Sequence, residues 1–357
     1  MSSILHFVHG VHALPVQLEA LRASHGLAPT DLVAIGPAAL HDHALAFEAA
    51  PGTSASALAL RPHLGSLAYG IVVRCSDRAS QAIGHVMAHE PGPAGATPRQ
   101  VEVFPDRGAP LRVLAWLPAA AEPDDWRPPS PEVLHSLREG LRHWRLPTRG
   151  LDNAALGRPG VDLVTSVFVY GTLLRGETRA GVWRRHRIRC AVMAVAPGRL
   201  YTTDDDYPAV KPSPDAGDVQ GDFIRVAGIQ RLLRELDEIE EYQPDVLSGQ
   251  LFRRVLTDVG VAGKVRRAWM YVAGDALSLR DPIETGSWRR HLGREGLFAQ
   301  RLADFYEARL AGRPWQDLLE TSALPPAGAL TLAQALAQGR IGELRLAQRA
   351  NAWTALT

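Results

Sequence analysis

The same succession of sequence patterns occurs twice in this chain, and this repetition restricts the possible folds more than any other feature. An apolar run that ends at a glycine begins each block, at residues 4–10 and 161–171. Alternating stretches, a helix-like segment and further alternating stretches follow in both blocks. A repeat of this long period indicates duplication of a domain rather than a solenoid. The pattern by itself predicts an α+β protein.

The boundaries of the two blocks follow from length and from turn residues. A chain of 357 residues fits about two domains of ordinary size. Residues 148–159 carry turn residues and little periodicity, so we expect a linker over residues 151–162. It would join a first domain at 1–150 to a second at 163–293. Amphipathic patterns in residues 294–357 predict a helical tail.

Composition excludes several classes of partner. Lys and Arg number 39 against 38 Asp and Glu, a formal charge of +1, which gives no basis for binding nucleic acid or an acidic membrane. No apolar run approaches the ~20 residues that cross a bilayer. The first residues lack the basic start of a secretory signal, and the two cysteines form no disulfide framework. We therefore expect a cytoplasmic protein.

Three separated motifs in the second block carry the functional signal. They are VFVYGTLL at residues 167–174, LDEIEEY at 236–242 and AWMYV at 268–272. Together, and in this order, they resemble the gamma-glutamylcyclotransferase-like family over about residues 167–290. The resemblance is to the branch that includes the gamma-glutamylamine cyclotransferases and the plant avirulence-induced proteins.

The residues in these motifs suit acid–base chemistry on an anionic substrate. A strand that ends in a glycine turn can expose successive backbone N–H groups, which form a nest for an anion. Glu240 lies at the end of a helix-like segment beside Asp237, Glu238 and Glu241. Like charges close together, with partial burial, would raise the pKa of one carboxyl group towards neutrality.

The resemblance implies a specific reaction and fold. The α-amine of a γ-glutamyl compound would attack its own γ-carbonyl, releasing 5-oxoproline and an amine or amino acid, as in a cyclising acyltransferase or lyase. Glu240 would be the catalytic acid and base. The substrate, a small γ-glutamyl molecule, would bind at the turn and the late strand, through Tyr170, Gly171, Thr172, Leu173 and Tyr271. The family fold is a small mixed β-barrel with flanking helices, and its reaction requires neither metal nor cofactor.

The first block resembles the same family more faintly, so that the chain would hold two tandem barrels. Its turn is Phe7-Val8-His9-Gly10-Val11-His12, with histidine in place of the turn tyrosine. The resemblance makes His9, Gly10, Val11 and His12 candidate substrate-binding residues and Glu90 a second candidate catalytic residue. Trp116 stands near the position of the late-strand aromatic residue.

Several alternatives remain open from the sequence. His85 and His89 have the i, i+4 spacing that could chelate a metal, although no third ligand can be assigned, and scattered histidines are the favoured interpretation. The glycine turn could hold a carboxylate ligand without turnover. Both domains could act on different γ-glutamyl compounds, or one could be a scaffold. Arg253 and Arg254 could pair with the acidic cluster. The leaving amine and the oligomeric state are undetermined.

Overall fold

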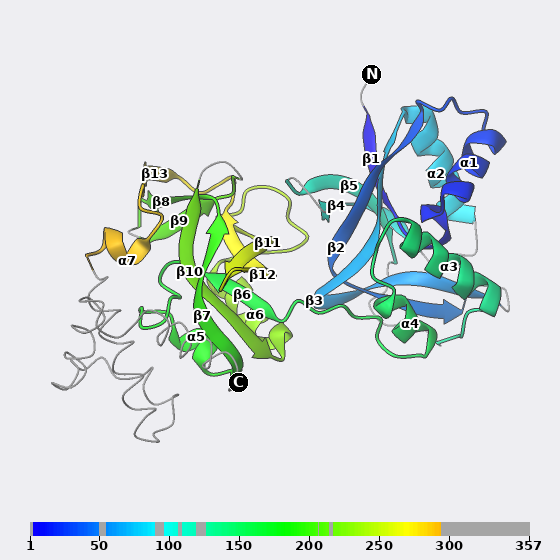
Figure 1. Ribbon diagram of the computed structural model, residues 1–357. Coiled ribbons are helices and arrows are strands. Elements are labelled where there is room, and N and C mark those ends of the chain that lie inside the picture. Colours follow the sequence, from blue (N-terminus) through cyan, green and yellow to red (C-terminus); the bar gives the residue numbers. More distant parts are fainter. Residues whose placement is uncertain are drawn as a thin grey trace. The chain divides into compact units, whose positions relative to one another are not determined.

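The computed structural model of the chain consists of two compact units, Met1–Leu163 and Val164–Thr357, and each is described by itself (Figure 1). The structure describes residues 3–49, 55–89, 96–105, 109–118, 126–205, 207–213 and 217–293. The side chains of residues 88 and 89 are not included. The helical tail expected over residues 294–357 therefore lies outside the described residues, and so does Glu90.

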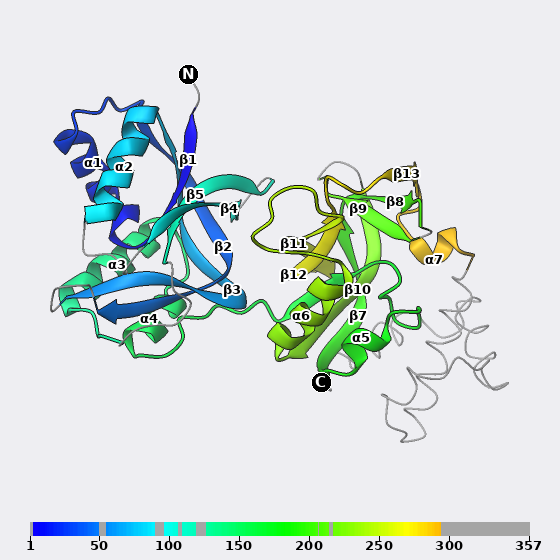
Figure 2. The ribbon, with the colours of Figure 1, turned by 180° about the vertical axis from the view of Figure 1, so that it is seen from behind.

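A closed five-stranded barrel with the strand order β1-β3-β2-β4-β5 forms the first unit. Strand β1 pairs antiparallel with β3 and parallel with β5, and the parallel pair closes the barrel. In both views helices α1 and α2 lie side by side (Figures 1 and 2). The elements are β1 (Ile4–Val8), η1 (Gly10–Ala13), α1 (Pro15–Ser24), β2 (Leu32–Ala49), β3 (Ser56–Cys75), α2 (Asp77–His89), β4 (Thr97–Pro105), β5 (Leu111–Leu117), α3 (Pro131–His143) and α4 (Arg149–Ala155).

The second unit is built on a closed five-stranded barrel with the order β10-β6-β12-β11-β7, and a small sheet of order β13-β8-β9 accompanies it. Strand β6 runs antiparallel to β10 and parallel to β12. The elements are β6 (Ser166–Val169), α5 (Gly181–Arg184), β7 (Arg187–Pro197), β8 (Arg199–Thr203), β9 (Pro208–Lys211), β10 (Asp218–Ala227), α6 (Ile229–Ile239), β11 (Phe252–Val261), β12 (Lys264–Ala273), β13 (Leu279–Pro282) and α7 (Trp288–His291).

The two barrels have the same connectivity. In each, the first barrel strand lies between the third and the fifth barrel strand in chain order, and the pair formed with the fifth is parallel. The third barrel strand carries a glycine at the same place in both barrels. A Cβ at Gly70 would meet Val8 O and the Phe7 ring. A Cβ at Gly221 would likewise meet Val169 O and the Phe168 ring. The expected fold class, α+β with two mixed barrels and flanking helices, is confirmed for the described residues.

The strand registers show which residues correspond in the two barrels. His6 pairs with Leu114 across the parallel strands of the first barrel, and Val167 pairs with Trp269 in the second. If His6 is taken as the equivalent of Val167, then His9, three residues later, corresponds to Tyr170. The same count gives Trp116 as the counterpart of Tyr271.

Helix α6 places the end of the LDEIEEY motif against the second barrel. Its apolar residues follow the i, i+3, i+4, i+7 spacing, which puts them on one face. This face is fully buried, with Ile229, Leu232, Leu233 and Leu236 each at most 1% exposed. The helix ends at Glu240, and Glu241 follows with a positive φ of 53°. The chain therefore turns sharply directly after Glu240, which fixes that residue at the end of a buried helix.

The segment expected to be a linker is partly helical. Residues 149–155 form α4, in which Leu151 and Ala154 are each 1% exposed and belong to the apolar core around Phe7 and Phe47. Beyond α4, the backbone N–H of Asp162 donates to Ser66 Oγ at 3.0 Å, so that this residue also belongs to the first unit. A helix with only two apolar core contacts has too weak a pattern to be recognised in sequence, which explains the difference.

Among the described residues, the structure contains no helix with both the length and the apolar character required to span a bilayer.

Candidate active site

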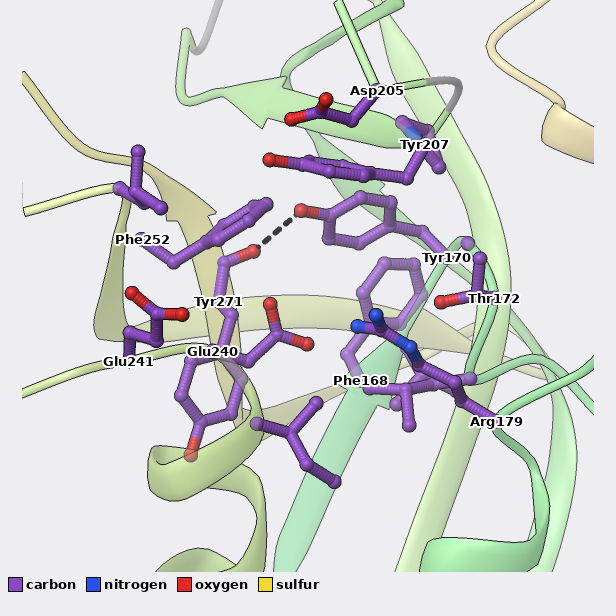
Figure 3. A pocket seen from close by; sticks show the side chains of 16 residues that line it. Phe168, Tyr170, Thr172, Arg179, Asp205, Tyr207, Glu240, Glu241, Phe252 and Tyr271 are labelled. Atoms are coloured by element: carbon purple, nitrogen blue, oxygen red, sulfur yellow. Dashed lines mark hydrogen bonds between the residues drawn. The ribbon is translucent and has the colours of Figure 1, made fainter. Parts of the chain in front are cut away.

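A cavity of about 380 Å³ opens at the end of strand β6 in the second unit (Figure 3). It brings together residues that are far apart in the sequence, from the turn after β6, the end of α6 and the middle of β12. All of the candidates predicted in this unit line it, namely Tyr170, Gly171, Thr172, Leu173, Glu240 and Tyr271. Their proximity agrees with the predicted site, and their individual roles stay predictions.

The turn after β6 presents unused backbone donors to this cavity. In the described part of the chain, no hydrogen bond is recorded for the backbone N–H groups of Gly171, Thr172 and Leu173. The turn itself is held by other bonds, because the backbone N–H of Leu174 donates to Gly171 O and that of Arg179 donates to Thr172 O, both at 2.9 Å. Successive N–H groups in a turn are the kind of donors that bind anions, so this turn stays a candidate anion site.

Gly171 is required in this turn because of the space beside it. A Cβ at this position would lie 2.5 Å from Pro208 Cγ, so any side chain would displace the start of β9. Trp183 Nε1 donates to Leu173 O at 2.7 Å, and its side chain is fully buried. The turn is therefore packed on both sides and held rigidly, which favours an anion site that exists before a ligand arrives.

Glu240 is a half-buried carboxyl group at the C-terminal end of α6. Burial raises its pKa to about 7, and the nearby Arg179 partly opposes this shift. The expected rise in the pKa is found, and of the two causes expected from the sequence, burial and neighbouring carboxylates, burial is the one that produces it. A carboxyl group with a pKa near neutrality can both accept and return a proton at physiological pH.

Asp237 contributes no repulsion because it is paired inside the unit. Arg254 Nε donates to Asp237 Oδ1 at 2.8 Å, and the Tyr271 hydroxyl donates to the same oxygen at 2.6 Å. Arg254 is 1% exposed, with its guanidinium carbon 5.0 Å from the centre of the Trp269 ring. The pairing of Arg254 with the acidic cluster, one of the sequence alternatives, is therefore observed.

The polar groups of Tyr271 are hydrogen-bonded within the protein rather than free to bind a substrate. Its hydroxyl is directed to Asp237, and its backbone carbonyl accepts a hydrogen bond of 2.8 Å from the Tyr170 hydroxyl (Figure 3). Both tyrosine hydroxyls are thus used within the protein. The two rings line the cavity, so any contact that they make with a ligand is through ring surface.

Sequence analysis missed several residues that line the cavity, among them Arg179, Asp205, Tyr207 and Phe252. Tyr207 and Phe252 are aromatic residues outside the three motifs, and no pattern in the sequence indicated them. Arg179 lies in a loop without periodicity, and nothing in the sequence distinguishes it from the other arginines of this chain. Only the folding of the loop back onto Thr172 brings Arg179 to the cavity.

The corresponding turn of the first unit is packed closed. Beside Gly10 there is a space of only about 20 Å³, and its lining includes Leu58 and Leu137. A Cβ at Gly10 would meet Leu58 Cδ2 at 3.4 Å and Leu137 Cδ2 at 3.9 Å. Among the described residues, these two leucines from β3 and α3 therefore pack close to Gly10.

The candidate residues of the first unit lie in different surroundings. His9 is buried, and burial with a contribution from His12 lowers its pKa to about 4, so its ring is neutral. Val11 packs against the barrel core. His12 lines a different, largely apolar recess between α1 and α2. The assignment of His9, Gly10, Val11 and His12 to a substrate site stays a prediction, and Glu90 lies outside the described residues.

The histidine pair considered as a metal site is also only partly described. His85 is exposed on α2, and the side chain of His89 lies outside the described residues. In the part of the chain that the structure describes, no three His, Cys, Asp or Glu side chains are grouped to hold a metal ion.

Comparison with known proteins finds a family match in the second unit. The model of the family described as gamma-glutamyl cyclotransferase, AIG2-like, matches residues 167–290. The matched cyclotransferase-like domain begins in β6 and ends in α7, so it contains the glycine turn, α6 and Tyr271. The first unit lies outside the matched residues.

Individual relatives agree with this family. Over 107 residues, 30% of this chain, it is 29% identical to the gamma-L-glutamyl-butirosin B gamma-glutamyl cyclotransferase of Niallia circulans. The match spans 65% of the length of that curated relative.

Solved structures similar to the chain include a gamma-glutamyl cyclotransferase (18% identity, 43% of this chain and 86% of that chain, TM-score 0.36). Another is an AIG2-like protein from Mus musculus (19% identity, 32% of this chain and 79% of that chain, TM-score 0.27). A third is YkqA from Bacillus subtilis (16% identity, 76% of this chain and 84% of that chain, TM-score 0.30).

Proposed function

We propose that the second unit is a gamma-glutamyl cyclotransferase that cleaves a γ-glutamyl amide by cyclisation and releases 5-oxoproline and an amine or amino acid. The observation that carries this proposal is the juxtaposition, in one cavity, of three unused backbone N–H donors at Gly171–Leu173 and a carboxyl group, Glu240, whose pKa lies at about 7. The family of residues 167–290 supports it.

In this reaction the nest would hold the α-carboxylate of the γ-glutamyl group. Backbone N–H groups aimed at one point bind an anion without reorganisation. With the α-carboxylate fixed at the turn, the rest of the glutamyl chain would extend along the rings of Tyr170 and Tyr271. Holding the chain folded brings the α-amine near its own γ-carbonyl, and such positioning is a large part of the rate of an intramolecular reaction.

Glu240 would carry the proton between the two nitrogen atoms. As the neutral α-amine attacks the γ-carbonyl carbon, a new C–N bond forms and the ionised Glu240 accepts a proton from the attacking nitrogen. The protonated Glu240 then gives this proton to the leaving nitrogen as the γ-amide C–N bond breaks. One carboxyl group thus returns to its starting state, and no step of the proposed reaction requires a metal or a cofactor.

The test is the formation of 5-oxoproline by the full chain from a panel of γ-glutamyl amines, amino acids and peptides, measured by mass spectrometry. We expect Glu240→Gln to lose about 10²–10⁴-fold in rate, because the amide keeps the shape of the side chain but cannot accept the proton. Glu238→Gln is the matched control, since Glu238 is exposed on the same helix and does not line the cavity.

Two results would contradict the proposal. Full activity of Glu240→Gln with an unchanged melting temperature would remove Glu240 from the mechanism. Binding of a γ-glutamyl compound at the cavity without any turnover would instead support the carboxylate-binding module considered from the sequence.

A further inference from the structure

Arg179 is a cation in the cavity whose side chain has no protein partner among the described residues. Its backbone is fixed, because its N–H donates to Thr172 O at 2.9 Å and the next residue, Ala180, is fully buried. Its side chain is exposed, and no hydrogen bond or ion pair is recorded for it in the described part of the chain. A guanidinium has five N–H donors in a planar arrangement, so Arg179 offers all of them to a ligand.

Other arginines in the same unit are used within the protein. Arg175 is paired with Asp222 at 2.7 Å, and Arg254 is paired with Asp237 at 2.8 Å. Both of these guanidinium groups are buried in the unit. Arg179 therefore differs from them in exposure and in pairing, and its charge is directed to the open space of the cavity.

The position of this charge relative to Glu240 is shown by two observations. Arg179 lowers the pKa of Glu240 against the effect of burial, so the two groups interact electrostatically. In Figure 3 the guanidinium and the Glu240 carboxyl group point toward one another, yet no ion pair joins them. The space between them is open to a substrate.

The proposed reaction determines which part of a substrate would reach Arg179. The α-carboxylate is accounted for by the backbone donors at Gly171–Leu173, and the leaving nitrogen must lie within reach of Glu240. Glu240 is half-buried and Arg179 is exposed, so a substituent on the leaving nitrogen would pass from Glu240 towards Arg179 as it leaves the cavity. Arginine binds carboxylates with two parallel charge-assisted hydrogen bonds.

Two further carboxyl groups line the cavity, Asp205 and Glu241, and both are exposed. Burial is the main cause that raises the pKa of the Tyr207 hydroxyl, Asp205 adds to the rise, and Arg179 opposes it. In Figure 3 Asp205 lies beyond the Tyr207 ring, on the opposite side of the view from Arg179. The carboxylate of a leaving group next to Arg179 would thus be separated from Asp205.

We propose that Arg179 determines substrate specificity by binding a carboxylate on the leaving amine, so that the preferred substrates are γ-glutamyl amino acids or peptides rather than γ-glutamyl amines. This inference rests on the proposed cyclotransferase function. It adds a role for a residue outside the glycine turn and the catalytic helix end.

The experiment compares substrates that differ only in this charge. The pair is γ-glutamyl-glycine, which carries the carboxylate, and γ-glutamyl-glycinamide, in which an amide of nearly the same size replaces it. For the full-length protein we expect kcat/KM to favour the carboxylate about 10- to 100-fold, the range expected for a hydrogen-bonded charge. Arg179→Gln should abolish this preference, because kcat/KM should fall further for the carboxylate than for the amide, while any loss caused by a higher pKa of Glu240 is common to both substrates.

Two further variants make the result specific. Arg179→Glu should reverse the preference, towards a γ-glutamyl diamine with a cationic leaving group. Arg187→Gln is the matched control, because Arg187 is an exposed arginine of the same unit that does not line the cavity, and it should keep the preference of the original protein.

The outcomes separate this inference from the proposed function. Absence of 5-oxoproline from every substrate would overturn the proposed function, and the inference would fall with it. Turnover with equal kcat/KM for the carboxylate and the amide would overturn the inference alone. An equal loss on both substrates in Arg179→Gln would also overturn it, because Arg179 would then bind the part that the two substrates share.

Discussion

At the scale of single residues, Glu240 combines two properties that oppose each other in most proteins. A carboxyl group near solvent ionises near its ordinary pKa, and one deep in a core stays neutral or is paired. Glu240 lies between these cases: burial raises its pKa to about 7, and Arg179 keeps the shift from growing larger. Both protonation states are therefore populated near neutral pH, which suits a group that must take and return one proton.

The ionisation of Glu240 predicts the pH dependence of the reaction. The carboxyl group acts first as a base, so the ionised form is the active one, and kcat/KM should fall as the pH is lowered through about 7. The α-amine of the substrate must also lose a proton, near pH ~8 for an ordinary α-amino group. We therefore expect two inflections in a plot of log kcat/KM against pH. A single inflection at the pKa of the substrate would contradict the role of Glu240.

At the scale of secondary-structure elements, α6 is joined to β11 and β12 by a polar cluster of Asp237, Arg254 and Tyr271. The Arg254 guanidinium and the Tyr271 hydroxyl converge on Asp237, and the Tyr271 carbonyl accepts from Tyr170. The cluster thus connects the end of α6, two barrel strands and the residue that begins the glycine turn. These hydrogen bonds link the position of Glu240 to that of the glycine turn.

Tyr271→Phe tests whether the hydroxyl of Tyr271 supports the site or binds the substrate. Removing it deletes a hydrogen bond to a charged group, which should lower the free energy of unfolding by about 1.5–3 kcal/mol. The ring that lines the cavity remains, so we expect KM to change less than threefold. Chemical denaturation and steady-state kinetics on the same preparation measure both quantities. A large rise in KM without loss of stability would show that the hydroxyl contacts substrate instead.

At the scale of the whole molecule, the same barrel connectivity occurs twice in the chain, but the size of the cavity beside the glycine turn differs between the two barrels. In the second unit the turn opens into a cavity of about 380 Å³, and in the first the space beside Gly10 is about 20 Å³. Leu58 and Leu137, which are distant from Gly10 in the sequence, line the small space of the first unit. The turns differ as well, because Gly10 has a positive φ of 67° and begins the 3-10 helix η1, whereas Gly171 has no positive φ. The same barrel connectivity can therefore carry different surroundings at its glycine turn.

The position of α4 gives a prediction about the extent of the first unit. Leu151→Ala should destabilise that unit by about 2–5 kcal/mol, because it removes a buried side chain from a packed core. Hydrogen exchange followed by peptide should show faster exchange in residues 3–163 and no change in residues 164–293. Leu156→Ala is the control, since this leucine is 65% exposed and should have little effect. Equal effects of the two substitutions would restore the reading of this segment as a linker.

The sequence by itself determined the features that depend on local pattern. The order of elements in each block, the apolar face of α6 and the residues of the VFVYGTLL and LDEIEEY motifs are all read from spacing and residue type over a few turns of chain. The resemblance of the three motifs to one family, rather than their spacing, indicated that Tyr170–Leu173, Glu240 and Tyr271 belong together, and all of them line one cavity.

Only the tertiary structure decided the features that depend on contacts between distant residues. These are the burial that raises the pKa of Glu240, the return of the Arg179 loop to Thr172, the leucines that fill the space beside Gly10, and the core position of Leu151. Periodicity reports which face of an element is apolar, but not what packs against that face. The volume of a cavity and the pKa of a group inside it are set by that packing, and neighbours in sequence do not supply it.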